Sequence, residues 1–176
     1  IEQIILLPAI GLNFACLSLT GQNFGAVKYD RIREGYLICL KYGLILMVCG
    51  SLFLYFGAGY FMKIFTDDIP VINTGIHYLQ IAALFAPILP VLNISIALMQ
   101  GVKKPIYTVF ISLFKEVVGA AIIIWLLCFY LNYKLQGLWV AILIVNYLSV
   151  IIFLFIVNNQ MKSLGLEIFR RKLPPN

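Results

Sequence analysis

A small number of polar and charged side chains interrupt the long apolar stretches of this sequence, and these are the side chains that could do chemistry. They are a carboxylate near the start of the chain, two asparagines, and an adjacent lysine and glutamate: Glu2, Asn13, Asn93, Lys115 and Glu116. Because polar and ionisable groups are costly in hydrocarbon, they usually face a protein interior or a water-filled cavity. We therefore predict that these five residues line a cavity for a substrate or an ion.

Glu2 belongs to a stripe of polar and small residues on one face of the first apolar stretch. The members of this stripe follow each other at helical spacing: Glu2, Ala9, Asn13, Cys16 and Thr20. That face should look into protein or water. Glu2 is its only carboxylate, so it could bind a proton or Na+ if a cavity reaches it. The alternative is that Glu2 lies near the outer membrane surface and is simply solvated.

Other kinds of chemistry are not favoured by the sequence. The apolar stretches contain no pair of carboxylates, no Ser/His/Asp constellation, no cluster of metal ligands and no phosphate-binding loop, so an enzyme is not predicted. Four cysteines lie inside apolar stretches without CxxC spacing: Cys16, Cys39, Cys49 and Cys128. They indicate neither a zinc site nor a disulfide framework.

The composition predicts an integral membrane protein. Hydrophobic residues make up 62% of the 176 residues and charged residues only 11%, and the mean hydropathy is +1.00, far from the usual composition of a soluble domain. The net charge of +6 comes from short basic clusters between apolar stretches, which favours membrane topology over nucleic-acid binding. The expected partner is the lipid bilayer. The chain starts with Ile1 and lacks the features of a signal peptide, so we interpret its start as a helix that is cut part-way.

Four uninterrupted apolar stretches are long enough to cross the roughly 30 Å of membrane hydrocarbon, which takes about 20 residues. They cover approximately residues 36–60, 74–100, 106–131 and 138–160, and residues 1–20 form a fifth, slightly more polar stretch. We therefore expect an all-α, polytopic membrane helix bundle of about five transmembrane helices over residues 1–160. Residues 161–176 would form a basic cytoplasmic tail, either resting on anionic headgroups or solvated as a topology anchor.

The basic residues between the stretches predict the orientation in the membrane. Those on one side are Lys28, Arg31, Arg33, Lys103, Lys104, Lys162, Arg170, Arg171 and Lys172. The other side has only Lys63 and Lys134. Because cytoplasmic loops carry the excess of lysine and arginine, the C-terminus is expected in the cytoplasm.

The third stretch should be bent near its middle. Its small and polar residues share one face: Gly75, Ala82, Ala86, Pro90, Asn93, Ala97 and Gln100. Small residues let helices approach closely, so packing is the simplest interpretation of this face. Pro87 and Pro90 remove backbone donors and clash with the preceding turn, which predicts a kink. Such a kink could act as a hinge or expose carbonyl groups to a cavity.

Lys115 and Glu116 lie nine or ten residues from the cytoplasmic end of the fourth stretch, about 14 Å along a helix and thus near mid-membrane. Adjacent residues on an α-helix diverge by about 100°, so we expect that these two cannot neutralise each other face to face. Lys115 should face inward together with Ser112, and Glu116 should be approached by another helix. A structural ion pair with a part of the protein outside this chain and a role in ion coupling remain equally open.

The junction after the first stretch carries a motif. It reads Gly21-Gln22-Asn23-Phe24-Gly25-Ala26, and its small residues should permit a tight exit from the membrane and close helix contact. Further matches follow in order: Phe65-Thr66-Asp67, Tyr78-Leu79, Gln100-Gly101 with Lys103 and Pro105, and Gly137-Leu138-Trp139. In this order and spacing, over nearly the whole chain, the sequence resembles the multidrug and toxic compound extrusion family. Members of that family carry a Gly-Gln-Asn-x-Gly-Ala motif at the inner end of the second helix of each six-helix half.

The resemblance implies a fold and a function. The five stretches correspond to helices eight to twelve of a twelve-helix transporter of the plasma or inner cell membrane, and the N-terminal six-helix half and the seventh helix lie outside this chain. Such transporters expel small cationic or amphipathic compounds in exchange for Na+ or H+, without covalent chemistry or a cofactor other than the coupling ion. The family's coupling carboxylates lie on the first, seventh or tenth helix. The stretch that matches the tenth helix has no Asp or Glu, which leaves the coupling ion open.

Two other functions remain. One is a lipid-linked oligosaccharide flippase of the same superfamily, which would use more cationic residues in its cavity, and Lys115 is the feature in its favour. The other is a membrane scaffold subunit without transport, in which the polar stripes would serve only as packing seams.

Overall fold

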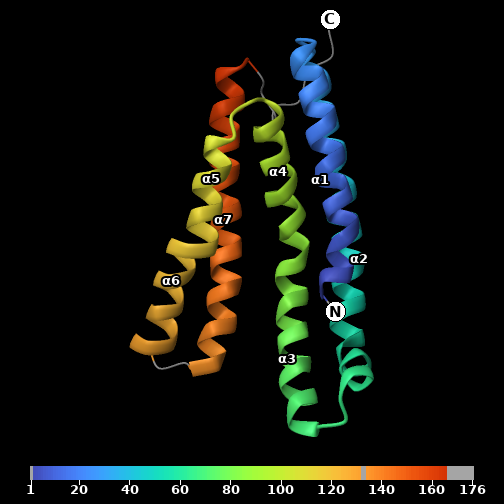
Figure 1. Cartoon of the computed structure of the whole chain (residues 1–176), viewed down its shortest axis with the longest axis vertical. Coiled ribbons are helices and arrows are strands. Elements are labelled where there is room, and N and C mark those ends of the chain that lie inside the picture. The colour runs from blue at the N-terminus through green and yellow to red at the C-terminus, as the bar shows by residue number, and fades with distance from the viewer. Residues whose placement is uncertain (1, 132–133, 166–176) are drawn as a thin grey trace, which may run out of the picture.

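The computed structural model describes residues 2–131 and 134–165, and their regular secondary structure is entirely helical (Figure 1). The elements are α1 (Glu2–Gly25), α2 (Tyr29–Phe65), α3 (Ile69–Phe85), the 3-10 turn η1 (Ala86–Ile88), α4 (Leu89–Gly101), α5 (Ile106–Leu113), the π-helix η2 (Phe114–Val118), α6 (Gly119–Ile124), the π-helix η3 (Trp125–Tyr130) and α7 (Lys134–Ser163). The all-α fold class is therefore confirmed.

Four helical segments are long and apolar enough to cross a membrane: Tyr29–Phe65, Ile69–Gly101, Ile106–Tyr130 and Gln136–Ser163. The 24-residue helix α1 packs beside them, against α2 and α4. The helices extend beyond the apolar stretches; α2, for example, starts with the charged residues Asp30, Arg31 and Arg33. A helix can continue outside the hydrocarbon because water then solvates its charged side chains. The chain is that of an integral membrane protein.

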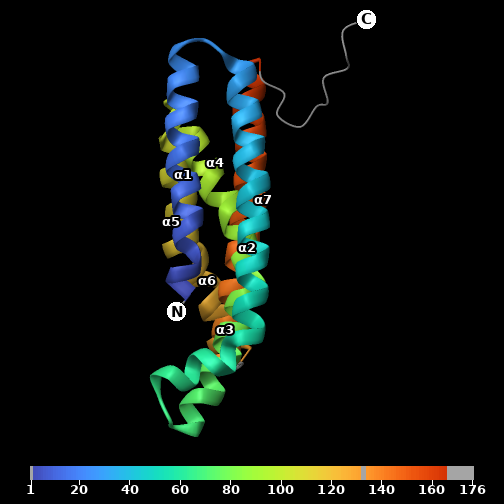
Figure 2. The ribbon, with the colours of Figure 1, turned by 90° about the vertical axis from the view of Figure 1, so that its right-hand side faces the viewer.

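The helices run up and down, so that alternate connections meet at the same end of the bundle. The α1–α2 turn, the α4–α5 turn and the end of α7 lie together, and the α2–α3 turn lies at the opposite end (Figures 1 and 2). At the first end, Lys104 Nζ donates hydrogen bonds to Gln160 Oε1 at 2.8 Å and to Ser163 Oγ at 3.4 Å. The α4–α5 connection is thus fixed to the end of α7, and basic residues gather at this end.

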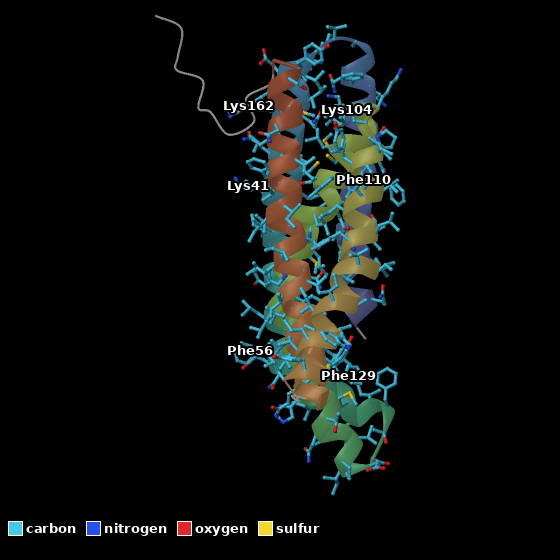
Figure 3. The ribbon with its side chains drawn as sticks, turned by 90° about the vertical axis from the view of Figure 1, so that its left-hand side faces the viewer. Lys41, Phe56, Lys104, Phe110, Phe129 and Lys162 are labelled. Atoms are coloured by element: carbon cyan, nitrogen blue, oxygen red, sulfur yellow. The ribbon has the colours of Figure 1, made fainter. Side chains whose placement is uncertain are left out.

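Helix α4 lies at the centre of the bundle and contacts α1, α2, α5 and α7. In the most apolar window of Ile69–Gly101, 50% of the residues are buried, against 11% in Ile106–Tyr130. The outward faces of α2 and of η3 carry large exposed side chains, such as Phe56 at 81% and Phe129 at 70% exposure (Figure 3). Such faces are stable only against lipid or further protein.

The third apolar stretch is interrupted by the 3-10 turn η1, at the position where Pro87 and Pro90 stand. Pro87 has no N–H group, so it cannot form the helical bond to the carbonyl of Ala83, four residues earlier. Ser51 Oγ of α2 donates a hydrogen bond to that carbonyl. Tyr147 Oη of α7 donates to the next carbonyl, that of Leu84, at 3.1 Å. The kink is therefore held from two neighbouring helices.

Removal of these donors should loosen the kink. We expect Ser51→Ala and Tyr147→Phe each to lower the stability of the complete protein by about 0.6 kcal/mol, the average measured for hydrogen bonds between membrane helices, and by at most about 1.7 kcal/mol. Thermal unfolding of the detergent-purified protein measures this loss. Tyr42→Phe, which alters an exposed tyrosine of α2, is the matched control. If the unfolding temperatures of both variants equal that of the control, these two hydrogen bonds do not stabilise the kink.

Candidate functional site

Helices α1 and α4 meet through the predicted polar residues. Asn13 Nδ2 of α1 donates a hydrogen bond to the backbone carbonyl of Asn93 of α4 at 3.0 Å. Next to it, Cys16 Sγ lies 3.8 Å from the carbonyl oxygen of Ile94. Ala9, Cys16 and Thr20 are all buried, so the predicted stripe on the first helix faces protein. This contact fixes the position of Asn93, which also lines a cavity.

A cavity of about 120 Å³ opens between α4 and the α5–η2 segment. Its polar lining consists of Asn93, Ser112, Lys115 and Glu116, and its apolar lining of Leu92, Ile96 and Ile111. Three of the five predicted site residues thus line one cavity, and a fourth, Asn13, bonds to the backbone of one of them. The fifth, Glu2, starts α1, but its side chain lies outside the described part of the structure.

Lys115 and Glu116 form an ion pair, so the expectation that they cannot neutralise each other was wrong. Lys115 Nζ lies 2.5 Å from Glu116 Oε1. The reason is local: both belong to the π-helix Phe114–Val118, whose wider i→i+5 turn rotates successive residues by less than the roughly 100° of an α-helix. The lysine side chain is 23% exposed and the glutamate side chain 67%. Lys115 is therefore the more enclosed partner, and its carboxylate neighbour stays accessible.

The motif at the α1–α2 junction has a different geometry from the one predicted. A Cβ atom added at Gly21 or Gly25 would meet nothing within 4 Å, so contact with another described helix does not require a glycine at either position. The turn instead places Val27 in the left-handed region, with φ of 58°, and Lys28 N–H bonds the carbonyl of Asn23 at 2.9 Å. The glycine that permits close contact between α1 and α4 is Gly101 of α4, where an added Cβ atom would come within 2.6 Å of Thr20.

The other motif side chains bond within their own helix. Gln22 Nε2 donates to Ser18 Oγ at 3.2 Å, and Asn23 Nδ2 donates to the carbonyl of Leu19 at 2.8 Å. Gly21, Gln22, Gly25 and Ala26 are exposed. The motif therefore presents its small residues away from the described bundle.

Two functional candidates on α7 were missed in the sequence. Asn146 Oδ1 and Ser149 Oγ are buried and have no hydrogen-bond partner among the described residues. The signal was present, because the two polar residues stand three positions apart in an otherwise apolar helix. The buried hydrogen bond between Tyr36 and Ser95, at 2.8 Å, was also missed, since a tyrosine near a membrane surface is ordinary and suggests no buried partner.

The residues that the structure describes contain no group of three or more His, Cys, Asp or Glu side chains that could hold a metal ion. Their cysteines are all free. Glu116 is the one carboxylate in the lining of the cavity, together with the amide of Asn93 and the hydroxyl of Ser112.

This arrangement of helices is that of known membrane transporters. It matches a multidrug resistance MATE family transporter of the MOP superfamily in an inward-facing conformation, with a TM-score of 0.87, 19% identity, and coverage of 93% of this chain and 38% of the other. It matches the MATE transporter ClbM in complex with Rb+ with a TM-score of 0.83, 18% identity, and coverage of 89% and 36%.

A third match is a MOP superfamily transporter from Pyrococcus furiosus, for which a reversed polarity of the binding pocket suggests a different function. Its TM-score is 0.87 and its identity 19%, over 93% of this chain and 37% of the other. The chain therefore spans little more than a third of the length of these transporters. No curated protein has significant similarity to it.

The fold is thus that of one part of a MATE-type transporter. The model of the MatE family matches residues 1–125 of this chain, which is well over half of its 176 residues. The chain belongs to the MatE family, the multidrug and toxic compound extrusion transporters.

The polar lining of the cavity, to which Glu116 belongs, predicts that water reaches it. In a variant of the complete protein without native cysteines, we expect Glu116→Cys to react with a membrane-impermeant, positively charged methanethiosulfonate reagent. Phe110→Cys is the control, because Phe110 is equally exposed on the same helical segment and its apolar surroundings should exclude the reagent. Labelling is measured as a decrease in the subsequent reaction of the same cysteine with a fluorescent thiol reagent. Absence of labelling at both positions would contradict a water-filled site.

Proposed function

We propose that the chain is the C-terminal lobe of a secondary active transporter that exports cationic or amphipathic compounds in exchange for Na+ or H+. The observation that carries this proposal is the cavity that joins Asn93, Lys115 and Glu116 between the helices that are apolar enough to span a membrane. A carboxylate there is costly and is retained where a cation or a proton uses it. The membership in the MatE family supports the same class of function.

Each polar residue has a role in this proposal. Glu116 is the accessible anion that attracts the coupling ion or the cationic substrate, and Asn93 supplies a neutral amide to the same cavity. Asn13 positions Asn93 through its bond to the backbone of α4. Glu2 is a second candidate for the ion on α1. No covalent step, cofactor or enzymatic activity is part of the proposal.

The choice of coupling ion rests on chemistry. Since the α3–α4 segment, which matches the family's tenth helix, has no carboxylate, the ion would bind Glu116 on the neighbouring segment instead. One carboxylate binds a monovalent ion better than a divalent ion, because its single negative charge fully compensates the charge of the monovalent ion only. The solved relative with bound Rb+ favours a monovalent metal ion such as Na+ over a proton.

A further six-helix lobe and a seventh helix would complete the transporter. The relatives are more than twice as long as this chain, and the α2 and α5–η3 surfaces expose large apolar side chains. In the proposed assembly, the two lobes face each other across a central cavity and rock against each other, with part of these surfaces covered by the other lobe and the rest by lipid.

The oligosaccharide flippase is supported less well. A flippase cavity must hold a phosphate group, and free lysine or arginine side chains would do so. Lys115 is the one cationic residue in the lining of this cavity, and it contacts Glu116. For the scaffold, the Asn13–Asn93 contact would be only a packing contact.

Efflux of a fluorescent cationic dye from right-side-out membrane vesicles tests the proposed function. The vesicle membrane contains the protein expressed from the complete reading frame, and a Na+ or proton gradient across the membrane drives efflux. We expect Glu116→Gln to reduce gradient-driven efflux at least about tenfold, because a charge-assisted bond contributes about 1.5 to 3 kcal/mol and about 1.4 kcal/mol is a factor of ten.

Glu34→Gln is the matched control for this experiment, because Glu34 is exposed near the start of α2 and outside the cavity. Undiminished efflux in the Glu116→Gln variant would remove Glu116 from the site. Absence of gradient-driven efflux of cationic dyes in the unaltered protein would leave the flippase or the scaffold.

The proposed orientation has its own test. We place the basic end of the bundle, with the α1–α2 and α4–α5 connections and the C-terminus, in the cytoplasm of a cell whose plasma or inner membrane holds the protein. A C-terminal green fluorescent protein should then fluoresce, whereas a C-terminal alkaline phosphatase should be inactive. An active phosphatase fusion would reverse the orientation.

A further inference from the structure

Lys115 has two sets of possible partners. Its ammonium group contacts Glu116 Oε1. Both residues line the cavity of about 120 Å³, whose other polar lining is Asn93 and Ser112. An ammonium group has three N–H donors on a flexible four-carbon stem. The side chain is therefore flexible enough to change acceptors within the cavity that it lines.

We propose that Lys115 is a tethered cation that occupies the carboxylate of Glu116 while the site is empty, and that it turns into the cavity when an external monovalent cation binds Glu116. This inference rests on the proposed function, because it describes the regulation of the same site. In the occupied state, the Lys115 ammonium is held by the amide oxygen of Asn93 and the hydroxyl of Ser112.

The charges of the site require such an exchange. An uncompensated carboxylate within the membrane is unfavourable, and Lys115 compensates it when no ion is bound. An incoming cation would place two positive charges beside one carboxylate. Because the two positive charges repel each other, the lysine turns away from Glu116 in this proposal.

The cavity can accept the displaced group. Its volume of about 120 Å³ compares with about 30 Å³ per water molecule in the liquid, so the ammonium and a few waters fit. The cavity also offers oxygen acceptors, which a purely apolar cavity would not. The occupied site carries one net positive charge, which disfavours divalent ions and selects monovalent ones.

The π-helix keeps Lys115 and Glu116 close enough to pair, and Gly119 is part of the π turn. At the end of this segment, a Cβ atom on Gly119 would come within 2.7 Å of the carbonyl oxygen of Phe114, the group that Gly119 N–H bonds to close the π turn. A larger residue would therefore open the wide turn and return the segment to an α-helix. Lys115 and Glu116 would then diverge, and the tethered cation would be lost.

Equilibrium binding of radiolabelled tetraphenylphosphonium, a monovalent organic cation, to the purified complete protein tests this inference. We expect Lys115→Gln to tighten binding about fivefold, the factor that corresponds to about 1 kcal/mol, a typical upper value for a partly exposed ion pair. Gly119→Ala should tighten binding in the same direction through the helix geometry, and it provides a second variant if Lys115→Gln does not fold. Lys41→Gln, an exposed lysine of α2 (Figure 3), is the control and should bind like the unaltered protein.

The outcomes separate this inference from the proposed function. Loss of binding in Glu116→Gln together with tighter binding in Lys115→Gln supports both. Loss of binding in Glu116→Gln with unchanged or weaker binding in Lys115→Gln overturns the tethered cation and leaves the transporter site intact. Unchanged binding in Glu116→Gln overturns the site itself, and with it the role of Lys115.

Discussion

The constraint on which this structure depends is that hydrocarbon offers no hydrogen-bond partner to the backbone. Every buried N–H and C=O group must be satisfied within the protein. Pro87 breaks this rule inside α3–α4, because it leaves the Ala83 carbonyl without its helical partner. Ser51 of α2 and Tyr147 of α7 supply donors at that point. The two helices that flank the central segment are thus fixed beside its weakest turn.

The same constraint explains where polar side chains point. Asn23 and Asn146 bond carbonyls four residues earlier in their own helices, which satisfies their amide N–H groups without a neighbour. Asn13 instead bonds across to α4, and a contact of this kind fixes two helices relative to each other. The candidate site lies beside this fixed contact rather than on a loop. A site on rigid helices holds its ligands at defined positions, which an ion site requires.

The sequence predicts the helices well because their apolar stretches are long, and it predicts Asn93, Lys115 and Glu116 as neighbours of a cavity because polar residues are costly there. It cannot predict the π-helix over Phe114–Val118, since no residue in that segment has a strong preference for the wide turn. Gly119 becomes informative only once the position of the Phe114 carbonyl is known. The free carbonyl at Ala83 follows from Pro87, but only tertiary packing shows that Ser51 reaches it.

An ion pair between adjacent residues differs from one between helices in a way that matters for a moving transporter. A pair that joins two helices breaks when these helices shift, and each broken partner is then a buried, uncompensated charge. Lys115 and Glu116 belong to one turn of one helix, so rigid-body movement of helices or lobes leaves their distance unchanged. Only an event at the pair itself, such as the arrival of another cation, can separate the two charges. In the proposed exchange, the π turn therefore makes the charge state of the site depend on what binds there and not on the movement of the lobes.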